Sequence, residues 1–184
     1  MLVVEICIVV ALIILNGLLA MSELAIVSSR PARLRRMVDM NVTGSRRALS
    51  LASDPGKFLS TVQIGITLVG VLSGAFSGAT IGLRLASWLM GFGMSAGVAD
   101  VIGIGAVVAV ITYASLIIGE LVPKQIALLN PEAVAVRVAP AMTILAKAML
   151  PLVWILNASG KAVLWLLRQR GGPAKKSLRK KSGP

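Results

Sequence analysis

Two acidic residues stand inside long apolar stretches of the sequence, where a charged side chain is costly. Glu23 lies near the end of the stretch 2–28, and Glu120 lies near the end of the stretch 98–122. An ionised side chain at the bilayer centre costs about 2.5–3.5 kcal/mol on insertion scales, so such residues commonly serve a function. Carboxylate, hydroxyl and amide oxygens are ligands for hard cations such as Mg²⁺, Ca²⁺ or Na⁺. The two glutamates therefore predict a cation site. The alternative is that both lie at the membrane interface, in water or paired with a neighbouring basic residue.

Neutral polar and small residues form a stripe along the next apolar stretch. Steps of three and four residues place them on one face of a helix: Ser60, Gln63, Thr67, Gly70, Gly74 and Ser77. Similar residues recur in the stretches that carry the two glutamates. We predict an ion pathway lined by Asn16, Ser60, Gln63, Thr67, Thr112 and Ser115. Glycines that recur every four residues also let helices approach closely, so Gly74, Gly78 and Gly82 are predicted to pack against another helix.

The elements that hold these residues must be membrane-spanning helices. Hydrophobic residues make up 57% of the 184 residues, charged residues only 14%, and the mean hydropathy is +0.88. A soluble domain carries about 25% charged residues. We therefore expect an all-α integral membrane protein with spans at about 2–28, 57–88 and 98–122, each exceeding the roughly 20 residues that a crossing needs. The absence of histidine and the single Cys7 argue against zinc, haem and histidine-based catalysis, so we expect no enzyme.

The net charge of +12 gathers beside the apolar stretches, in residues 30–57 and 168–181. No aromatic residue interrupts either basic run, which argues against nucleic-acid binding. Basic loops stay in the cytoplasm, so the predicted multi-pass protein of the cell membrane has an external N-terminus and a cytoplasmic C-terminus. Anionic lipid headgroups of the inner face are the expected partners of the basic residues.

The segments outside the spans have their own signals. Residues 30–52 and 131–167 are expected to form interfacial helices, because the first is amphipathic and prolines break the second. The second segment either lies in the interface or re-enters the membrane. Residues 171–184 are predicted to be a disordered basic tail or a shortened linker.

Three segments resemble the transmembrane domain (DUF21) shared by the CorC and cyclin M (CNNM) proteins. They are NGLLAMSELAIVSSRPARLRR at 16–36, STVQIGITLVGVLSGAFSG at 60–78 and ITYASLIIGELVPKQIALLNPE at 111–132. The run GELVPK at 119–124, followed by Pro131-Glu132, is the most specific part. The resemblance covers nearly all of residues 1–170.

The resemblance implies a three-span domain, a juxtamembrane belt of amphipathic helices, a homodimer, and export of Mg²⁺ driven by inward Na⁺. By motif it places the ion on Ser22, on the Gly70–Ser73 segment and on Glu120. With Glu23 from the argument above, the predicted metal ligands are Ser22, Glu23, Gly70, Ser73 and Glu120. Many relatives carry asparagines where this chain has Ile66 and Gly70. Relatives usually continue into cytoplasmic CBS modules, which we expect in the full-length protein.

Two other functions remain open at this point. Some similar proteins export polyamines, and a diamine would use the same carboxylates as counter-ions. A membrane scaffold whose glycines only drive association is the third interpretation, although a scaffold has no use for two carboxylates inside its spans.

Overall fold

The computed structural model describes residues 2–166, and the regular elements in this range are all helices. The predicted all-α membrane fold is confirmed. The helices are α1 (Leu2–Ser28), α2 (Pro31–Asp39), α3 (Ser45–Ser53), α4 (Pro55–Ser77), α5 (Leu83–Met90), α6 (Ala96–Leu116), α7 (Val122–Leu129), α8 (Pro131–Ala148) and α9 (Leu150–Leu166). Two wide π-helical turns join consecutive helices: η1 (Gly78–Gly82) and η2 (Ile117–Leu121). The predicted tail at 171–184 lies outside the described residues.

Three continuous helical stretches are long and apolar enough to cross a membrane: Leu2–Ser28, Pro55–Met90 and Ala96–Leu129. The number rises to four if α8 and the following helix count together as one broken span, judged by length and composition alone. At about 1.5 Å per residue even the 27-residue α1 covers the roughly 30 Å hydrocarbon core. The placement of residues 138–167 in the interface therefore stays a prediction.

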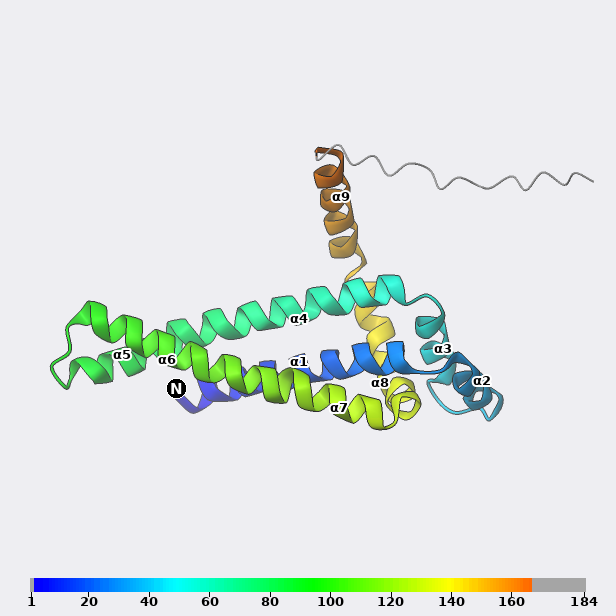
Figure 1. The fold of residues 1–184 in the computed structure, drawn as a ribbon, viewed down its shortest axis with the longest axis horizontal. Helices are drawn as coiled ribbons and strands as arrows, with labels where there is room; N and C mark the ends of the chain where they lie inside the picture. Colours follow the sequence, from blue (N-terminus) through cyan, green and yellow to red (C-terminus); the bar gives the residue numbers. More distant parts are fainter. Residues whose placement is uncertain (1, 167–184) are drawn as a thin grey trace, which may run out of the picture. The chain divides into compact units, whose positions relative to one another are not determined.

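Within the described range, residues 2–149 belong to one compact unit, and residues 150–166 belong to a second. In the first unit α1 packs against α4, against η2 and α7, and against α8, while α5 packs against α6. Figure 1 shows these long helices side by side, with the loop after α5 at the same end as the N-terminus. We call this the loop end, marked by residues 91–95. The opposite end carries α2, α3 and α8, and we call it the belt end.

The buried apolar core lies mainly toward the belt end. Most of its members come from the second half of α1, the first half of α4 and the belt helices, among them Leu19, Ala25, Ile26, Leu34, Phe58, Val62, Ala135 and Val136. In contrast, large apolar side chains along the long helices are exposed, as Val3, Val71 and Val101 show at 63–74%. Lipid tails are as apolar as these side chains, so exposure there carries no hydrophobic penalty.

Two prolines act differently from their predicted roles as helix breakers. The third span was expected to end at Pro123, but the helix continues through α7 to Leu129. Pro123 has no N–H for the Gly119 carbonyl in the α-helical register, and the wide η2 turn, in which the Val122 N–H bonds the Ile117 carbonyl, absorbs the mismatch. Pro140 lies inside α8, and the helix ends near Met149 instead.

Candidate functional site

A cavity of about 160 Å³ lies between α4 and α6. We call it the span cavity; its lining residues are Gly70, Ser73, Gly74, Ile111, Thr112, Ser115 and Leu116. The two glycines create the space, because a Cβ at either position would meet nothing within 4 Å. The structure thus brings together two predicted metal ligands, Gly70 and Ser73, and two predicted pathway residues, Thr112 and Ser115.

The hydroxyl groups of the cavity differ from the others on these helices. A serine or threonine inside a helix can donate to a carbonyl of the preceding turn, as Ser60, Thr61, Thr67, Ser77, Thr80 and Ser87 do. Within the described residues Thr112 and Ser115 form no side-chain hydrogen bond, and the Ser73 Oγ is buried without a partner although Ser73 is only 4% exposed. Buried polar atoms normally find partners, so the buried Ser73 oxygen is available to a ligand, and the exposed Thr112 and half-buried Ser115 hydroxyls lie beside it on the cavity wall.

Asn16 of α1 lies near Ser115, one of the cavity-lining residues. Its Nδ2 donates to the Gly119 carbonyl at 3.2 Å, and its Oδ1 is buried without a partner. A Cβ on Gly119 would meet the Asn16 Nδ2 and the Ser115 Oγ, each at 3.3 Å. Glycine at 119 therefore permits the close crossing, and Pro123 leaves the 119 carbonyl free for Asn16. The Asn16 Oδ1 is thus a second buried oxygen without a partner, after the Ser73 Oγ, and it belongs to a residue near the cavity-lining Ser115.

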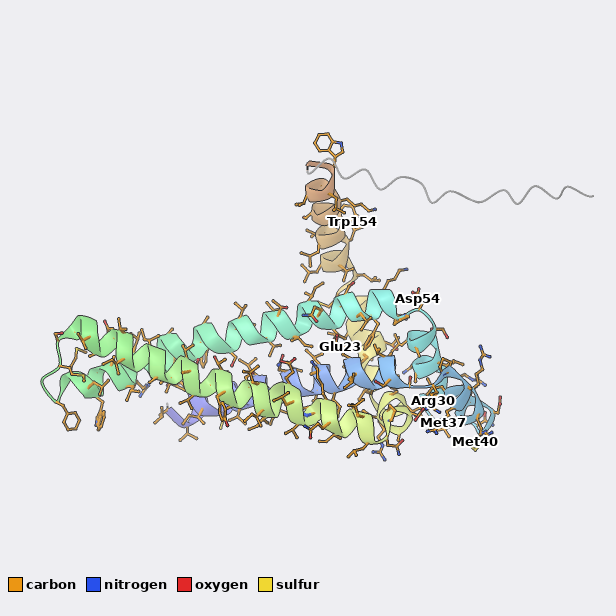
Figure 2. The ribbon with its side chains drawn as sticks, in the orientation of Figure 1. Glu23, Arg30, Met37, Met40, Asp54 and Trp154 are labelled. Carbon is orange, nitrogen blue, oxygen red and sulfur yellow. The ribbon has the colours of Figure 1, made fainter. Side chains whose placement is uncertain are left out.

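The two predicted carboxylates have different surroundings. Glu120 follows Gly119 in η2 and accepts a hydrogen bond from the Lys124 Nζ at 2.7 Å, with its side chain 40% exposed. Glu23 is half-buried and forms no ion pair with the described residues. Figure 2 shows Glu23 on the half of α1 nearer the belt end, with Arg30 just beyond the helix. Pairing of Glu120 with Lys124 is thus realised, while Glu23 is left without a basic partner in this range.

Of the remaining predicted site residues on α1 and α4, Ser22 is buried and the others are exposed. Ser22 is fully buried, and its hydroxyl donates to the Leu18 carbonyl at 2.6 Å. Ser60, Gln63 and Thr67 lie on an exposed face of α4 that continues from the cavity toward the start of that helix. Their common face agrees with the periodicity of the stripe, and the hydroxyls of Ser60 and Thr67 donate to carbonyls of their own helix.

Of the three glycines predicted to pack against another helix, two do so in this structure and one does not. Gly78 and Gly82 lie against α6 of the same chain, where a Cβ would meet Ile104 at 3.5 Å and at 2.9 Å, respectively. Gly74 contacts no other helix and lines the span cavity instead. Gly103 of α6, which the sequence did not single out, completes this packing, because its Cβ would lie 2.8 Å from the Gly82 carbonyl.

Sequence reasoning missed two ion pairs. Glu132 at the start of α8 is buried, accepts the Arg30 backbone N–H at 3.2 Å and lies 3.6 Å from the Arg33 guanidinium. Glu5 accepts from Arg84 at 2.9 Å at the loop end. Glu132 lies 102 residues after Arg30 and 99 after Arg33, and Arg84 lies 79 residues after Glu5, so no local pattern could have paired them.

No group of three acidic, histidine or cysteine side chains occurs together among the residues that the structure describes. A cation in the span cavity would therefore be held by neutral oxygens, with one carboxylate nearby. This arrangement suits a transported ion better than a tightly bound structural metal, because transport requires release.

Comparison with known proteins identifies the domain. The family model of the cyclin M transmembrane N-terminal domain matches residues 7–181. A UPF0053 protein of Synechocystis is 47% identical over 158 residues, which are 86% of this chain and 35% of that protein. The UPF0053 inner membrane protein YfjD of Escherichia coli is 36% identical over 137 residues, 74% of this chain and 29% of that protein. The polyamine export protein of Escherichia coli is 27% identical over 153 residues, 83% of this chain and 34% of that protein.

The chain spans roughly a third of the length of these relatives. The family match itself covers nearly the whole chain, and it includes α1, the cavity-lining helices α4 and α6, and the GELVPK motif. The resemblance inferred from three motifs is thus confirmed, and this chain belongs to the cyclin M transmembrane domain family.

Proposed function

We propose that this domain transports cations through the span cavity, with Mg²⁺ as the exported ion and inward Na⁺ as the coupling ion. One observation carries the proposal: the hydroxyls of Ser73, Thr112 and Ser115, which lack internal partners, converge on one cavity between apolar spans. Packing of two apolar helices gives no reason to leave the buried Ser73 oxygen without a partner. A path for a hard cation gives such a reason, because the cation takes this oxygen as a ligand.

The donor set fits Mg²⁺ in kind. Mg²⁺ takes six oxygen ligands at about 2.0–2.1 Å and often keeps some of its water. Serine and threonine hydroxyls and the carbonyl of Gly70, whose missing side chain leaves space, supply neutral ligands. Glu120, one helical turn beyond Leu116, supplies the negative charge. Ser22 and Glu23 complete the proposed set from α1.

A polyamine is the second candidate. One relative is named a polyamine export protein, and Glu120 already binds an ammonium group, the Lys124 Nζ, at 2.7 Å. A primary amine of a diamine could take the place of that ammonium with the same geometry. It would need hydrogen-bond acceptors, which the hydroxyls provide, but not six short oxygen contacts.

Calorimetry on the purified chain distinguishes these functions. We expect Mg²⁺ binding to be lost in Glu120→Gln and weakened in Ser73→Ala, because the first removes the counter-charge and the second removes a cavity oxygen. Ser87→Ala is the matched control, since the Ser87 hydroxyl bonds its own helix at 2.9 Å and lies outside the cavity. Putrescine replaces Mg²⁺ in a parallel titration.

Each outcome selects one function. Loss of Mg²⁺ affinity in Glu23→Gln but not in Glu120→Gln would show that the other carboxylate holds the ion. Binding of putrescine without Mg²⁺ binding would favour polyamine export. Parent affinity for both ligands in the glutamate and serine variants would leave the scaffold interpretation.

Coupling and assembly complete the proposal. Mg²⁺ efflux from proteoliposomes should require an opposing Na⁺ gradient. A homodimer is expected, because the exposed polar face at Ser60, Gln63 and Thr67 would be costly against lipid and is covered if a second copy or a water-filled path lies there. Light scattering of the detergent-solubilised chain measures the assembly, and a monomeric mass would contradict the dimer.

A further inference from the structure

A second cavity, of about 450 Å³, lies at the belt end. It is formed by residues 41–44 of the turn between α2 and α3 and by residues 45–47 at the start of α3, together with Val38 and with Pro140 of α8. It shares no lining residue with the span cavity. The cavity has no role in the proposed transport path.

The cavity is lined by cationic and neutral polar groups. Its lining residues include Arg46 and Arg47, which carry guanidinium groups, and Asn41 and Thr43, which carry an amide and a hydroxyl. No acidic side chain lines it, and neither arginine forms an ion pair with any residue in the range 2–166. Arginine presents a planar fork of N–H donors that matches the oxygens of a phosphate. The lining therefore favours an anion with several oxygens.

The turn that carries these groups is held in a fixed shape. Asn41 and Gly44 have positive φ angles of 56° and 88°, and the Val42 N–H bonds the Met37 carbonyl at 3.0 Å. Gly44 lies so close to the Val136 carbonyl of α8 that no Cβ would fit between them. A rigid turn keeps the backbone of the two arginines beside the same cavity, so that only their side chains must be ordered on binding.

The same turn carries apolar side chains that face outward. Met40 is 62% exposed and Val42 is 37% exposed, although both lie within seven residues of the arginine pair. Figure 2 shows Met37 and Met40 at the belt end, beyond the last turn of α1. Exposed apolar residues next to exposed arginines at the end of membrane spans are typical of a segment in the bilayer interface. The anion present at that depth is the phosphate of a lipid headgroup.

We propose that this cavity is a built site for the phosphate group of one anionic phospholipid. Arg46 and Arg47 bind the phosphate oxygens, and Met40 and Val42 lie among the acyl chains. The site differs from diffuse attraction between a basic belt and an anionic surface, because it assigns the affinity to two of several exposed arginines.

The chain offers a matched control for this assignment. Arg35 and Arg36 on α2 are also exposed, adjacent in sequence and without an ion pair to a described residue, but they do not line the cavity. Diffuse attraction predicts equal effects of neutralising either pair. A built site predicts a large effect for Arg46 and Arg47 only.

Native mass spectrometry of the full chain with dioleoyl phosphatidylglycerol measures the affinity of the first bound lipid. We expect R46Q/R47Q to weaken it by about 30-fold, the equivalent of about 2 kcal/mol for two arginines, and R35Q/R36Q to weaken it far less. R46K/R47K keeps the charge and loses the planar fork, so it should lose part of the affinity. Binding of phosphatidylcholine should be the same in all variants.

Three results would overturn the proposal. Equal losses in the two glutamine pairs would show diffuse attraction, and parent affinity in R46Q/R47Q would remove the site. Inorganic phosphate that binds alone and displaces phosphatidylglycerol would assign the cavity to a soluble anion. Melting temperatures in phosphatidylcholine check the fold of each variant, and R46K/R47K keeps the test valid if the glutamine pair is unstable.

Discussion

Gly103 of α6 approaches the backbone of α5 more closely than any side chain would permit. A Cβ at this position would lie 2.6 Å from the Ala86 nitrogen and 2.8 Å from the Gly82 carbonyl oxygen. Both neighbours are backbone atoms, so neither can rotate aside, and the two helices would have to separate. Gly105, on the same helix, has nothing within 4 Å of the equivalent position. The two glycines therefore form a matched pair for alanine substitution.

The difference between the two variants isolates the packing cost. Replacing glycine by alanine inside a helix gains up to about 1 kcal/mol through helix propensity, and this gain is common to both. Overpacking at Gly103 costs about 1–3 kcal/mol. We therefore expect Gly103→Ala to be about 1–3 kcal/mol less stable than Gly105→Ala, and Gly105→Ala to be at least as stable as the parent chain.

The free energy of unfolding can be measured in bilayers by steric trapping, or in mixed micelles by titration with sodium dodecyl sulfate. Surface substitutions usually change stability by no more than about 0.5 kcal/mol. Stabilities of Gly103→Ala and Gly105→Ala that agree within that margin would refute the close packing of α5 on α6.

Two further predictions concern the belt end and the orientation of the chain. Glu132→Ala should lose about 1.5–3 kcal/mol of unfolding free energy, the value of a hydrogen bond to a charged group, because the Arg30 N–H loses its buried acceptor; Glu132→Gln keeps an acceptor oxygen and should lose less, and parent stability of both in the same titration would contradict this. In a Cys7→Ala background, a membrane-impermeant maleimide added to intact cells should label Met94→Cys but not Gly172→Cys. External labelling at position 172 would contradict the predicted cytoplasmic C-terminus.

The spans were predictable because their signal is local. Apolar composition over twenty or more residues determines that a helix can cross a bilayer, whatever its neighbours do. The polar stripe on α4 was likewise visible in the spacing of its residues, because helical periodicity depends only on position along the chain. The three apolar spans and the face of α4 that carries the polar stripe therefore agree with the sequence, whereas the end of the third span does not.

Features that depend on which helices meet were not predictable. The spacing of Ser73 and of Thr112 marks a face on each helix, but only the pairing of α4 with α6 places both in one cavity. The sequence predicts that the third span ends before Pro123, yet the helix continues. The wide η2 turn and the Asn16 hydrogen bond to the Gly119 carbonyl have no local sequence signal, so this continuation was not predictable. Glycine spacing suggested packing for Gly74, whereas the structure leaves it open beside the cavity.

The exposure of the Glu120–Lys124 pair determines whether Glu120 can serve a moving cation. A buried ion pair costs about 3–5 kcal/mol when one partner is removed, because the other charge is left uncompensated. Here the side chains are 40% and 33% exposed within the third candidate span, and where water reaches that face such a pair contributes about 0–1 kcal/mol. A cation that replaces the Lys124 ammonium therefore loses little, and the freed ammonium can be solvated. In the proposed transport, Lys124 would neutralise Glu120 between ions and leave when the next ion arrives.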